Sequence, residues 1–385
     1  MRERPLSGLR VVDLSRLLPG PLATLVLSDL GADVVKVEDP AGGDYLRHLP
    51  PQIDGTNAVF IALNRGKRSV ALDLKRSAGR EALLRLCERS DVLVESFRPG
   101  VLARLGLGPD VLRERCPRLV VASLTGYGQQ GPLASRAGHD VNYVGRSGLL
   151  GVSGPAGALP AHPGGQVADV GGALACVVAV LAALLERQKT GRGAYLDVSL
   201  RDSAALFALV GLCTAWAGGS TGRGLDALTG GIAPYGIYST ADDRFVTLAA
   251  LEPKFWSAFC AAVGLQPAME ALLPGPHQRE HIERLRTLFS TRTREAWTEL
   301  GAAHDCCLEP VLEPGEVRDD PELRARGLVA DIAGGSTRTT VLRTPVALDA
   351  VPGRVPRLGE HTEEVLREIG FDEGRIAEAR GARTA

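Results

Sequence analysis

The first third of the 385-residue chain repeats one pattern, in which short β-branched runs alternate with amphipathic helical stretches. Because a helix between two strands returns the chain to the same end of a sheet, such strands are parallel. Helices on both faces then bury both sides of each strand, which explains apolar runs such as LVVA. The pattern predicts a doubly wound α/β domain on a parallel sheet. Its strands are expected at 9–15, 32–38, 68–74, 91–96 and 118–124.

The rest of the chain departs from this pattern. A long apolar helix is predicted over 170–188 and a strand over 194–200, and the Gly-rich stretch 217–231 then ends the alternation. Beyond it, 235–251 is typical of a β-hairpin that turns at Asp242–Asp243. Helices follow near 252–263, 278–290 and 292–303, then a strand over 339–348 and a last helix capped by Thr362.

These changes predict two domains of different kinds. The expected segments are a large α/β domain over 1–216, a linker or flap over 217–231, a smaller α+β domain over 232–326 and a C-terminal return to the large domain over 327–385.

Composition narrows the class of protein. The net charge is −1 and both signs are interspersed, so we expect neither a nucleic-acid nor a membrane partner. Seven cysteines form no CxxC pair and no metal-ligand spacing, which predicts reduced thiols, no metal and a cytoplasmic location. The start MRERPLSGLR lacks the apolar core of a signal peptide.

A dinucleotide site is the first function to test against this pattern. Glu38 ends the second strand, where an acidic residue binds a ribose in dinucleotide-binding sheets. The first strand–helix turn, SRLLPGP, has one glycine where that motif has three, and its prolines remove N–H groups that a pyrophosphate needs. We therefore expect a different nucleotide-bearing ligand.

Motifs along nearly the whole chain point to a known family. They include GLRVVDLSRLLPGPLATLVLSDLGADVVKVEDP, NRGKRSVALDLK, DVLVESFRPGV, LTGYGQQGP, AGHDVNY and GEHTEEVL. These segments resemble the family III CoA-transferase superfamily, which also contains the α-methylacyl-CoA racemases. The resemblance implies a large domain made from both chain ends, a small domain, and two interlocked subunits in a homodimer.

The resemblance also implies an acyl-CoA thioester substrate, with no metal and no other tightly bound cofactor. The phosphates of CoA need cations, and NRGKRS and FRPG supply Arg65, Lys67, Arg68 and Arg98. We expect these side chains to hold CoA at the strand ends of the large domain. Racemase-like sequences often carry an arginine where this chain has Asp39, so one phosphate contact is missing or replaced.

The resemblance assigns the catalytic roles to His139, Asp169 and Glu252. In racemases, a carboxylate and a histidine work on opposite faces of a planar enolate, and a glutamate supports the imidazole. A carboxylate and a neutral imidazole suit this task because one takes a proton while the other gives one. In the transferases, the aspartate is instead a nucleophile that forms an anhydride and then an enzyme–CoA thioester. Asp140 is a supporting residue.

Each residue also has a purely structural interpretation. Asp140 or Asp169 could cap a helix, Glu252 could be a first-turn acid before a proline, and His139 could be a solvated loop residue. If Asp169 opens the helix 170–188, free N–H groups of that helix could stabilise an enolate oxygen, although capping makes the carboxylate a weaker base.

We predict an acyl-CoA racemase or epimerase that inverts the α-carbon of a 2-methyl or other 2-substituted acyl-CoA, because racemase-like sequences keep the His-Asp pair of HDVNY. The alternative is a CoA transferase that uses an Asp169 anhydride and thioester. In its favour, LTGGIAPYGIY departs from the racemase pattern and the chain has only two methionines to line an acyl path. A third hypothesis, a non-catalytic acyl-CoA-binding scaffold, conflicts with the three acid–base candidates.

Overall fold

The computed structural model describes residues 4–334, 337–346 and 353–380, so the end of the predicted strand 339–348 lies outside the described residues. The chain divides into two compact units. Unit 1 comprises 1–143, 166–204 and 318–385, and unit 2 comprises 144–165 and 205–317. Both chain ends therefore belong to unit 1. The division differs from the predicted segments, because 144–165, 205–216 and the expected linker 217–231 belong to unit 2 and 318–326 belongs to unit 1.

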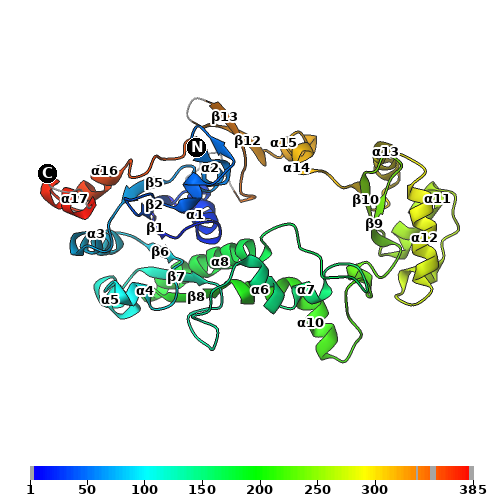
Figure 1. Ribbon diagram of the computed structural model, residues 1–385, viewed down its shortest axis with the longest axis horizontal. Helices are drawn as coiled ribbons and strands as arrows, with labels where there is room; N and C mark the ends of the chain where they lie inside the picture. The colour runs from blue at the N-terminus through cyan, green and yellow to red at the C-terminus, as the bar shows by residue number, and fades with distance from the viewer. Residues whose placement is uncertain (1–3, 335–336, 347–352, 381–385) are drawn as a thin grey trace. The chain divides into compact units, whose positions relative to one another are not determined.

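Unit 1 is built on a six-stranded parallel sheet of order β5-β2-β1-β6-β7-β8 (Figure 1). The chain begins at the centre, runs outward to β5 and returns to fill the other side from β6, so the strand order reverses between β1 and β6. This confirms the predicted doubly wound α/β class. The strands are β1 (Arg10–Leu14), β2 (Asp33–Glu38), β5 (Arg68–Ala71), β6 (Val92–Glu95), β7 (Val120–Thr125) and β8 (Tyr195–Ser199).

Two groups of helices bury the sheet. One core joins strands β1, β2, β5, β6 and β7 to five helices, namely α3 (Ser77–Glu88), α4 (Val101–Arg104), α5 (Pro109–Arg115), α16 (Thr362–Glu368) and α17 (Glu373–Arg380). The other group is α1 (Pro19–Asp29) and α8 (Val167–Thr190), which pack on each other and on the strands. The other short elements are η1 (Tyr45–His48), β3 (Gln52–Ile53), β4 (Thr56–Asn57), α2 (Ala58–Asn64), α6 (Asp140–Arg146), α9 (Leu200–Ala205), α15 (Pro321–Ala325), β12 (Val329–Gly334) and β13 (Thr337–Leu342).

Helix α8 has the length and composition of a membrane-spanning helix, but half of its most apolar stretch is buried within the protein. Its contacts with α1, β7 and β8 are those of a core helix. It begins at Val167, with Gln166 at the N-cap, rather than at 170 as expected. Asp169 is therefore the third helical residue and does not cap the helix.

Unit 2 has a three-stranded antiparallel sheet, in which β9 (Tyr235–Ser239) and β10 (Phe245–Ala249) form the predicted hairpin and β11 (Leu308–Pro310) pairs with β10. Stacked aromatic rings fill its core, with the Phe289 ring centroid 4.7 Å from that of Tyr238 and 4.8 Å from that of Trp297. Its other elements are α7 (Leu149–Val152), η2 (Leu206–Ala208), α10 (Leu209–Trp216), η3 (Ala227–Thr229), α11 (Pro253–Ala262), η4 (Met269–Leu272), α12 (Gln278–Phe289), α13 (Arg294–His304) and α14 (Pro314–Val317).

The C-terminal segment is fastened to the edge strand β5. The Thr362 hydroxyl accepts a hydrogen bond from the Ala71 N–H at 3.0 Å and donates to the Gly359 carbonyl at 2.7 Å. The prediction that Thr362 caps the last helix is wrong, because His361 is the N-cap residue and Thr362 is the first helical residue. Helix α17, which follows, was not expected.

A buried ion pair closes the far end of α1. Arg65 donates two hydrogen bonds to Asp29, at 2.6 and 2.8 Å, and both side chains are almost completely buried. Burial alone would raise the pKa of Asp29, but the hydrogen bonds and charge of Arg65 hold it below its usual value. The Thr344 hydroxyl donates a further bond to this carboxylate at 2.7 Å. The pair thereby joins α1, the segment after α2 and the C-terminal part of unit 1.

Replacing Arg65 by methionine should lower the free energy of unfolding by about 3–5 kcal/mol, because it leaves the Asp29 carboxylate buried without its cation. Urea unfolding at neutral pH measures the effect. Arg98→Met is the matched control: Arg98 is exposed, and its replacement should change stability by no more than about 0.5 kcal/mol. Equal effects of the two substitutions would contradict the structural role of Arg65.

Candidate functional site

His139 is held at the start of α6 with its imidazole exposed to solvent. Its backbone N–H donates to the Asn142 side chain at 3.0 Å, and its carbonyl accepts from the Asn142 N–H at 2.8 Å. The imidazole makes no hydrogen bond to the described residues. The helix start thus fixes the backbone of His139 and leaves its ring free to meet a ligand.

Tyr143, which the sequence analysis did not single out, fixes the segment before His139. Its hydroxyl donates to the Gly138 carbonyl, and its ring packs edge-on against Tyr127 with centroids 5.0 Å apart. A Cβ at Gly126 or Gly138 would lie only 2.4 or 2.7 Å from atoms of the Tyr143 side chain, so both positions require glycine. The glycines of TGYG and AGHD were the available signal that an aromatic ring packs there.

The Asp140 carboxylate caps α8, not the helix in which it lies. One of its oxygens accepts from the N–H groups of Ala168 at 2.7 Å and Asp169 at 3.0 Å. This negative charge sits at the positive end of the α8 dipole. The expectation that these N–H groups are free to stabilise an enolate oxygen is therefore wrong.

Asp169 lies beside this cap and is partly buried. Burial first, and then the nearby negative charge of Asp140, raise the pKa of Asp169 to about 7. Its carboxyl group therefore exchanges protons readily near neutral pH, which suits a general acid–base. A carboxylate that caps a helix is a weaker base, but Asp169 is not in that position. Asp140 accepts the hydrogen bonds from the first turn of α8, so they do not lower the pKa of Asp169.

The charge of Arg98 reaches the same group of residues. Burial, Tyr127 and the charge of Asp169 raise the pKa of Tyr143 to about 12, while Arg98 opposes this shift. The structure thus brings Asp140, Tyr143, Asp169 and Arg98 together in unit 1. Arg98 is exposed, and its guanidinium forms no ion pair or hydrogen bond with the described residues.

Glu252 belongs to unit 2, whereas His139, Asp140 and Asp169 belong to unit 1. It is exposed and occupies the N-cap of α11, where its carbonyl accepts from the N–H groups of Phe255 at 3.0 Å and Trp256 at 3.1 Å. Its side chain makes no capping bond. The Glu252 carboxylate is therefore not used to cap α11 and remains available to another group.

Three of the four predicted phosphate ligands are occupied by carboxylates of the protein itself. Arg65 is completely buried on Asp29, and Lys67 is buried with its ammonium 2.9 Å from an Asp13 oxygen. Arg68 opens β5, so it lies at the amino end of the sheet, where it pairs with Asp33 and with Glu364 and Glu368 of α16. For these three the prediction needs correction, because Arg65 and Lys67 neutralise buried carboxylates and Arg68 is paired with carboxylates nearer the surface. Of the four, Arg98 is the one whose charged group is exposed and has no carboxylate partner among the described residues.

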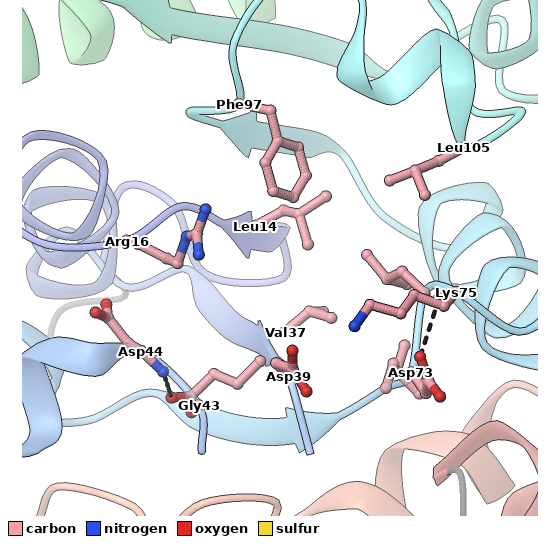
Figure 2. Close-up of a pocket in the computed structure, with 13 residues that line it drawn as sticks. Leu14, Arg16, Val37, Asp39, Gly43, Asp44, Asp73, Lys75, Phe97 and Leu105 are labelled. Atoms are coloured by element: carbon pink, nitrogen blue, oxygen red, sulfur yellow. Dashed lines mark hydrogen bonds between the residues drawn. The ribbon is translucent and has the colours of Figure 1, made fainter. Parts of the chain in front are cut away.

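A pocket of about 240 Å³ opens at the carboxyl ends of β1, β2, β5 and β6 (Figure 2). It lies where the strand order reverses, the usual ligand-binding place in a doubly wound sheet. Its apolar walls are Leu14, Val37, Leu72, Leu74, Phe97 and Leu105. Phe97 lines this pocket, and the charge of the neighbouring Arg98 opposes the rise in the pKa of Tyr143. The loop after β6 therefore borders both the pocket and the residues around Asp169.

Two cations line this pocket that the sequence analysis did not name. Arg16 follows β1 and Lys75 follows β5, and Figure 2 shows them on opposite sides of the pocket. Both are exposed, and neither forms an ion pair with the described residues. Their positions just after strand carboxyl ends were the signal that could have found them. Asp39 also lines the pocket, so an exposed carboxylate stands near these cations.

Glu38 lines the pocket but cannot serve a ribose. Its carboxylate accepts two hydrogen bonds from Arg47, at 2.8 and 2.7 Å, and one from the Ser69 hydroxyl at 2.7 Å. The side chain is almost completely buried. The occupied Glu38 carboxylate is a second reason to reject a dinucleotide site, independent of the missing glycines in the first strand–helix turn.

Replacing Asp169 by asparagine should stabilise the protein at pH 8 more than at pH 5. With a folded-state pKa of about 7, Asp169 keeps its proton between pH 4 and 7 while the unfolded chain has lost it, so wild-type stability falls as pH rises through this window. Asparagine avoids this cost, a gain on the order of 2–4 kcal/mol at pH 8. Urea unfolding at both pH values tests it. The gain should shrink when Asp140 is also asparagine, and a gain independent of pH would contradict the assignment.

Comparisons with known proteins agree with this architecture. The sequence model described as CoA-transferase family III matches residues 6–362. The chain is 36% identical to the alpha-methylacyl-CoA racemase of Homo sapiens, over 96% of this chain and 95% of that protein. It is 35% identical to a succinate–glutarate CoA-transferase of Agrobacterium fabrum, over 96% of each chain.

A solved structure has the same fold. A CAIB/BAIF family protein from Brucella suis superposes with a TM-score of 0.83 at 31% identity, covering 96% of this chain and all of that one. Family matches that extend over nearly the whole length, together with the parallel sheet and its strand-end pocket, lead to one assignment. The chain belongs to CoA-transferase family III.

Proposed function

We propose that the protein is an acyl-CoA racemase or epimerase that inverts the α-carbon of a 2-methyl or other 2-substituted acyl-CoA. The observation that carries the proposal is the pair of acid–base groups in unit 1: His139, whose exposed imidazole makes no hydrogen bond to the described residues, and Asp169, a partly buried carboxyl group with a pKa raised to about 7. A group that must take a proton from one stereoisomer and give one to the other works best with a pKa near the operating pH. Relatives that are racemases and relatives that are transferases both match this chain, so the chemistry of the site has to distinguish them.

In the proposed reaction, one base removes the α-proton and the electron pair of the C–H bond moves into the thioester as an enolate. The second base then delivers a proton to the opposite face, and the thioester is restored. Asp169 serves one face and His139 the other, and the resemblance to the racemases assigns Glu252 the support of the imidazole. The exposed, unbonded ring of His139 and the uncommitted carboxylate of Glu252 support these roles.

We propose that the strand-end pocket receives the nucleotide part of CoA. Apolar walls suit a purine ring, and Arg16 and Lys75 offer the charges that phosphates need. Arg98 continues this line of cations toward Asp169. Arg16 and Lys75 take the place of Arg65, Lys67 and Arg68, and both line the pocket with Asp39, where the resemblance led us to expect a missing contact. No metal and no other cofactor takes part in this proposal.

The second candidate is a CoA transferase in which Asp169 attacks the donor thioester. Its carbonyl carbon forms an anhydride with the carboxylate, CoA leaves as thiolate, and the thiolate then attacks the anhydride to give an enzyme–CoA thioester and the free acid. The similarity to a succinate–glutarate CoA-transferase favours this alternative. The exposed imidazole of His139 argues against it, because nucleophilic attack by Asp169 leaves that group without a role.

Incubation with a 2-methylacyl-CoA in D₂O separates the candidates. We expect deuterium at the α-carbon by NMR, and a loss of about 10²–10⁴-fold in exchange rate on Asp169→Asn or His139→Ala. His139→Ala should suppress exchange from one stereoisomer more than from the other, because each presents its proton to a different base. Glu252→Gln should be milder, and His304→Ala, an exposed histidine at the end of α13, should have no effect.

The transferase gives the opposite pattern. Hydroxylamine added after substrate would trap an adduct on Asp169, His139→Ala would be tolerated, and no deuterium would enter the α-position. That combination of results would replace the racemase assignment by the transferase. A protein with neither activity on acyl-CoA substrates would instead support the non-catalytic scaffold.

We also propose that the protein works as a cytoplasmic homodimer. Helix α10 has the apolar sequence LVGLCTAW but no buried residue, and Trp216 at its end is 77% exposed. Such a surface usually marks an interface. All seven cysteines are free thiols, which suits a reducing compartment.

Light scattering should give the mass of a dimer at dilute concentration, and Val210→Glu within α10 should shift the protein toward the monomer. A matched change at an exposed charged position, Arg113→Glu in α5, should leave the dimer intact. A wild-type monomer would contradict the dimer. Cell fractionation that finds the protein outside the cytosol would contradict the location.

A further inference from the structure

The residue after Arg16 has an unusual backbone conformation. Leu17 has φ of 64°, in the left-handed region that bulky L-residues rarely adopt. Such conformations persist when the surrounding structure determines them, and they cluster at ligand-binding places. Arg16, which precedes it, lines the strand-end pocket (Figure 2).

One buried ion pair holds the backbone on both sides of Arg16. The Lys36 ammonium donates to the Ser15 carbonyl at 2.9 Å, and the Asp44 carboxylate accepts from the Leu17 N–H at 3.1 Å. The ammonium and carboxylate are 3.2 Å apart, and both side chains are completely buried. The two charges thus neutralise each other, and each also forms a hydrogen bond to the backbone of a residue next to Arg16, Ser15 or Leu17.

The Arg16 guanidinium is in a different situation. It has no carboxylate partner among the described residues and is exposed. The rings of Tyr45 and Phe97 lie 5.8 and 5.9 Å from it. The backbone N–H of Arg16 donates to the Ser96 hydroxyl at 3.3 Å, next to Phe97. The backbone of Arg16 is therefore held tightly while its charge remains available to an anion.

We propose that Lys36 and Asp44 are positioning residues for anion binding at Arg16. Their ion pair holds Leu17 in the left-handed conformation and so directs Arg16 into the pocket, where its charge meets a phosphate of CoA. The inference rests on the proposed function for the identity of that anion. Asp44 lines the pocket, but the charged atoms of Lys36 and Asp44 are completely buried and committed to each other and to the backbone, so both residues act through Arg16 rather than by binding the ligand.

Calorimetric titration of the full-length protein with CoA, at low salt, tests this through a double-mutant cycle. Arg16→Ala should weaken binding about ten-fold, the usual worth of one charge-assisted hydrogen bond. Asp44→Asn should weaken it by about three- to ten-fold. In the Arg16→Ala background, Asp44→Asn should cost less than about two-fold more, because it acts only through Arg16.

Asp44→Asn leaves the Lys36 ammonium buried without its partner, so a second variant protects the test from misfolding. Lys36→Met with Asp44→Asn removes both charges, a change that buried pairs often tolerate. It should weaken CoA binding as Asp44→Asn does and should show the same dependence on Arg16. Asp29→Asn is the control, because it breaks an equally buried pair at the far end of α1 and should leave CoA affinity unchanged.

The outcomes separate this inference from the proposed function. If the wild type fails to bind CoA, or if Arg16→Ala binds as tightly as the wild type, the CoA pocket is wrong and the positioning role falls with it. If Arg16→Ala weakens binding but the Asp44 variants do not, or if their effects multiply with that of Arg16→Ala, the pocket stands and the positioning role is overturned.

Discussion

Three buried ion pairs of unit 1, Asp13–Lys67, Lys36–Asp44 and Glu38–Arg47, are the feature on which the strand-end pocket depends. All six side chains are buried, and their charges cancel. Buried charges are tolerated only when each has its partner and its hydrogen bonds. Removing any one would leave an uncompensated charge inside the protein, so the network fixes the strand ends and the loops that leave them.

The pKa of Lys67 depends both on its burial and on the neighbouring charge of Asp13. Burial lowers the pKa of Lys67 to about 8, although the neighbouring Asp13 carboxylate opposes this. Asp13 also accepts from the Thr24 hydroxyl of α1 at 2.7 Å, so the network ties β1 to the helix that packs on α8. One set of internal charges therefore supports the pocket and the helix whose first turn carries Asp169.

Two aspartates divide two tasks that one carboxylate could not perform together: Asp140 caps helix α8, and Asp169 keeps a raised pKa. The Asp140 carboxylate accepts hydrogen bonds from two N–H groups in the first turn of α8. The Asp169 carboxyl group therefore lacks these hydrogen bonds and lies near the negative charge of Asp140. The result is a partly buried carboxyl group with a pKa raised to about 7. A protein that keeps such a group gives up stability for reactivity, which is typical of functional sites.

Local pattern alone determined the doubly wound class, the hairpin and the main helices, because hydrophobic periodicity and turn residues act over a few positions. The resemblance carried by HDVNY and ADVGG pointed to His139, Asp140 and Asp169 as candidate site residues, and their roles stay predictions. Sequence could not decide which cations are free: Arg65, Lys67 and Arg98 look alike along the chain, and only the fold shows carboxylates against the first two. Arg16 and Lys75 were missed for the same reason. The charge state and direction of a side chain depend on neighbours distant in sequence, and those neighbours are set by tertiary structure.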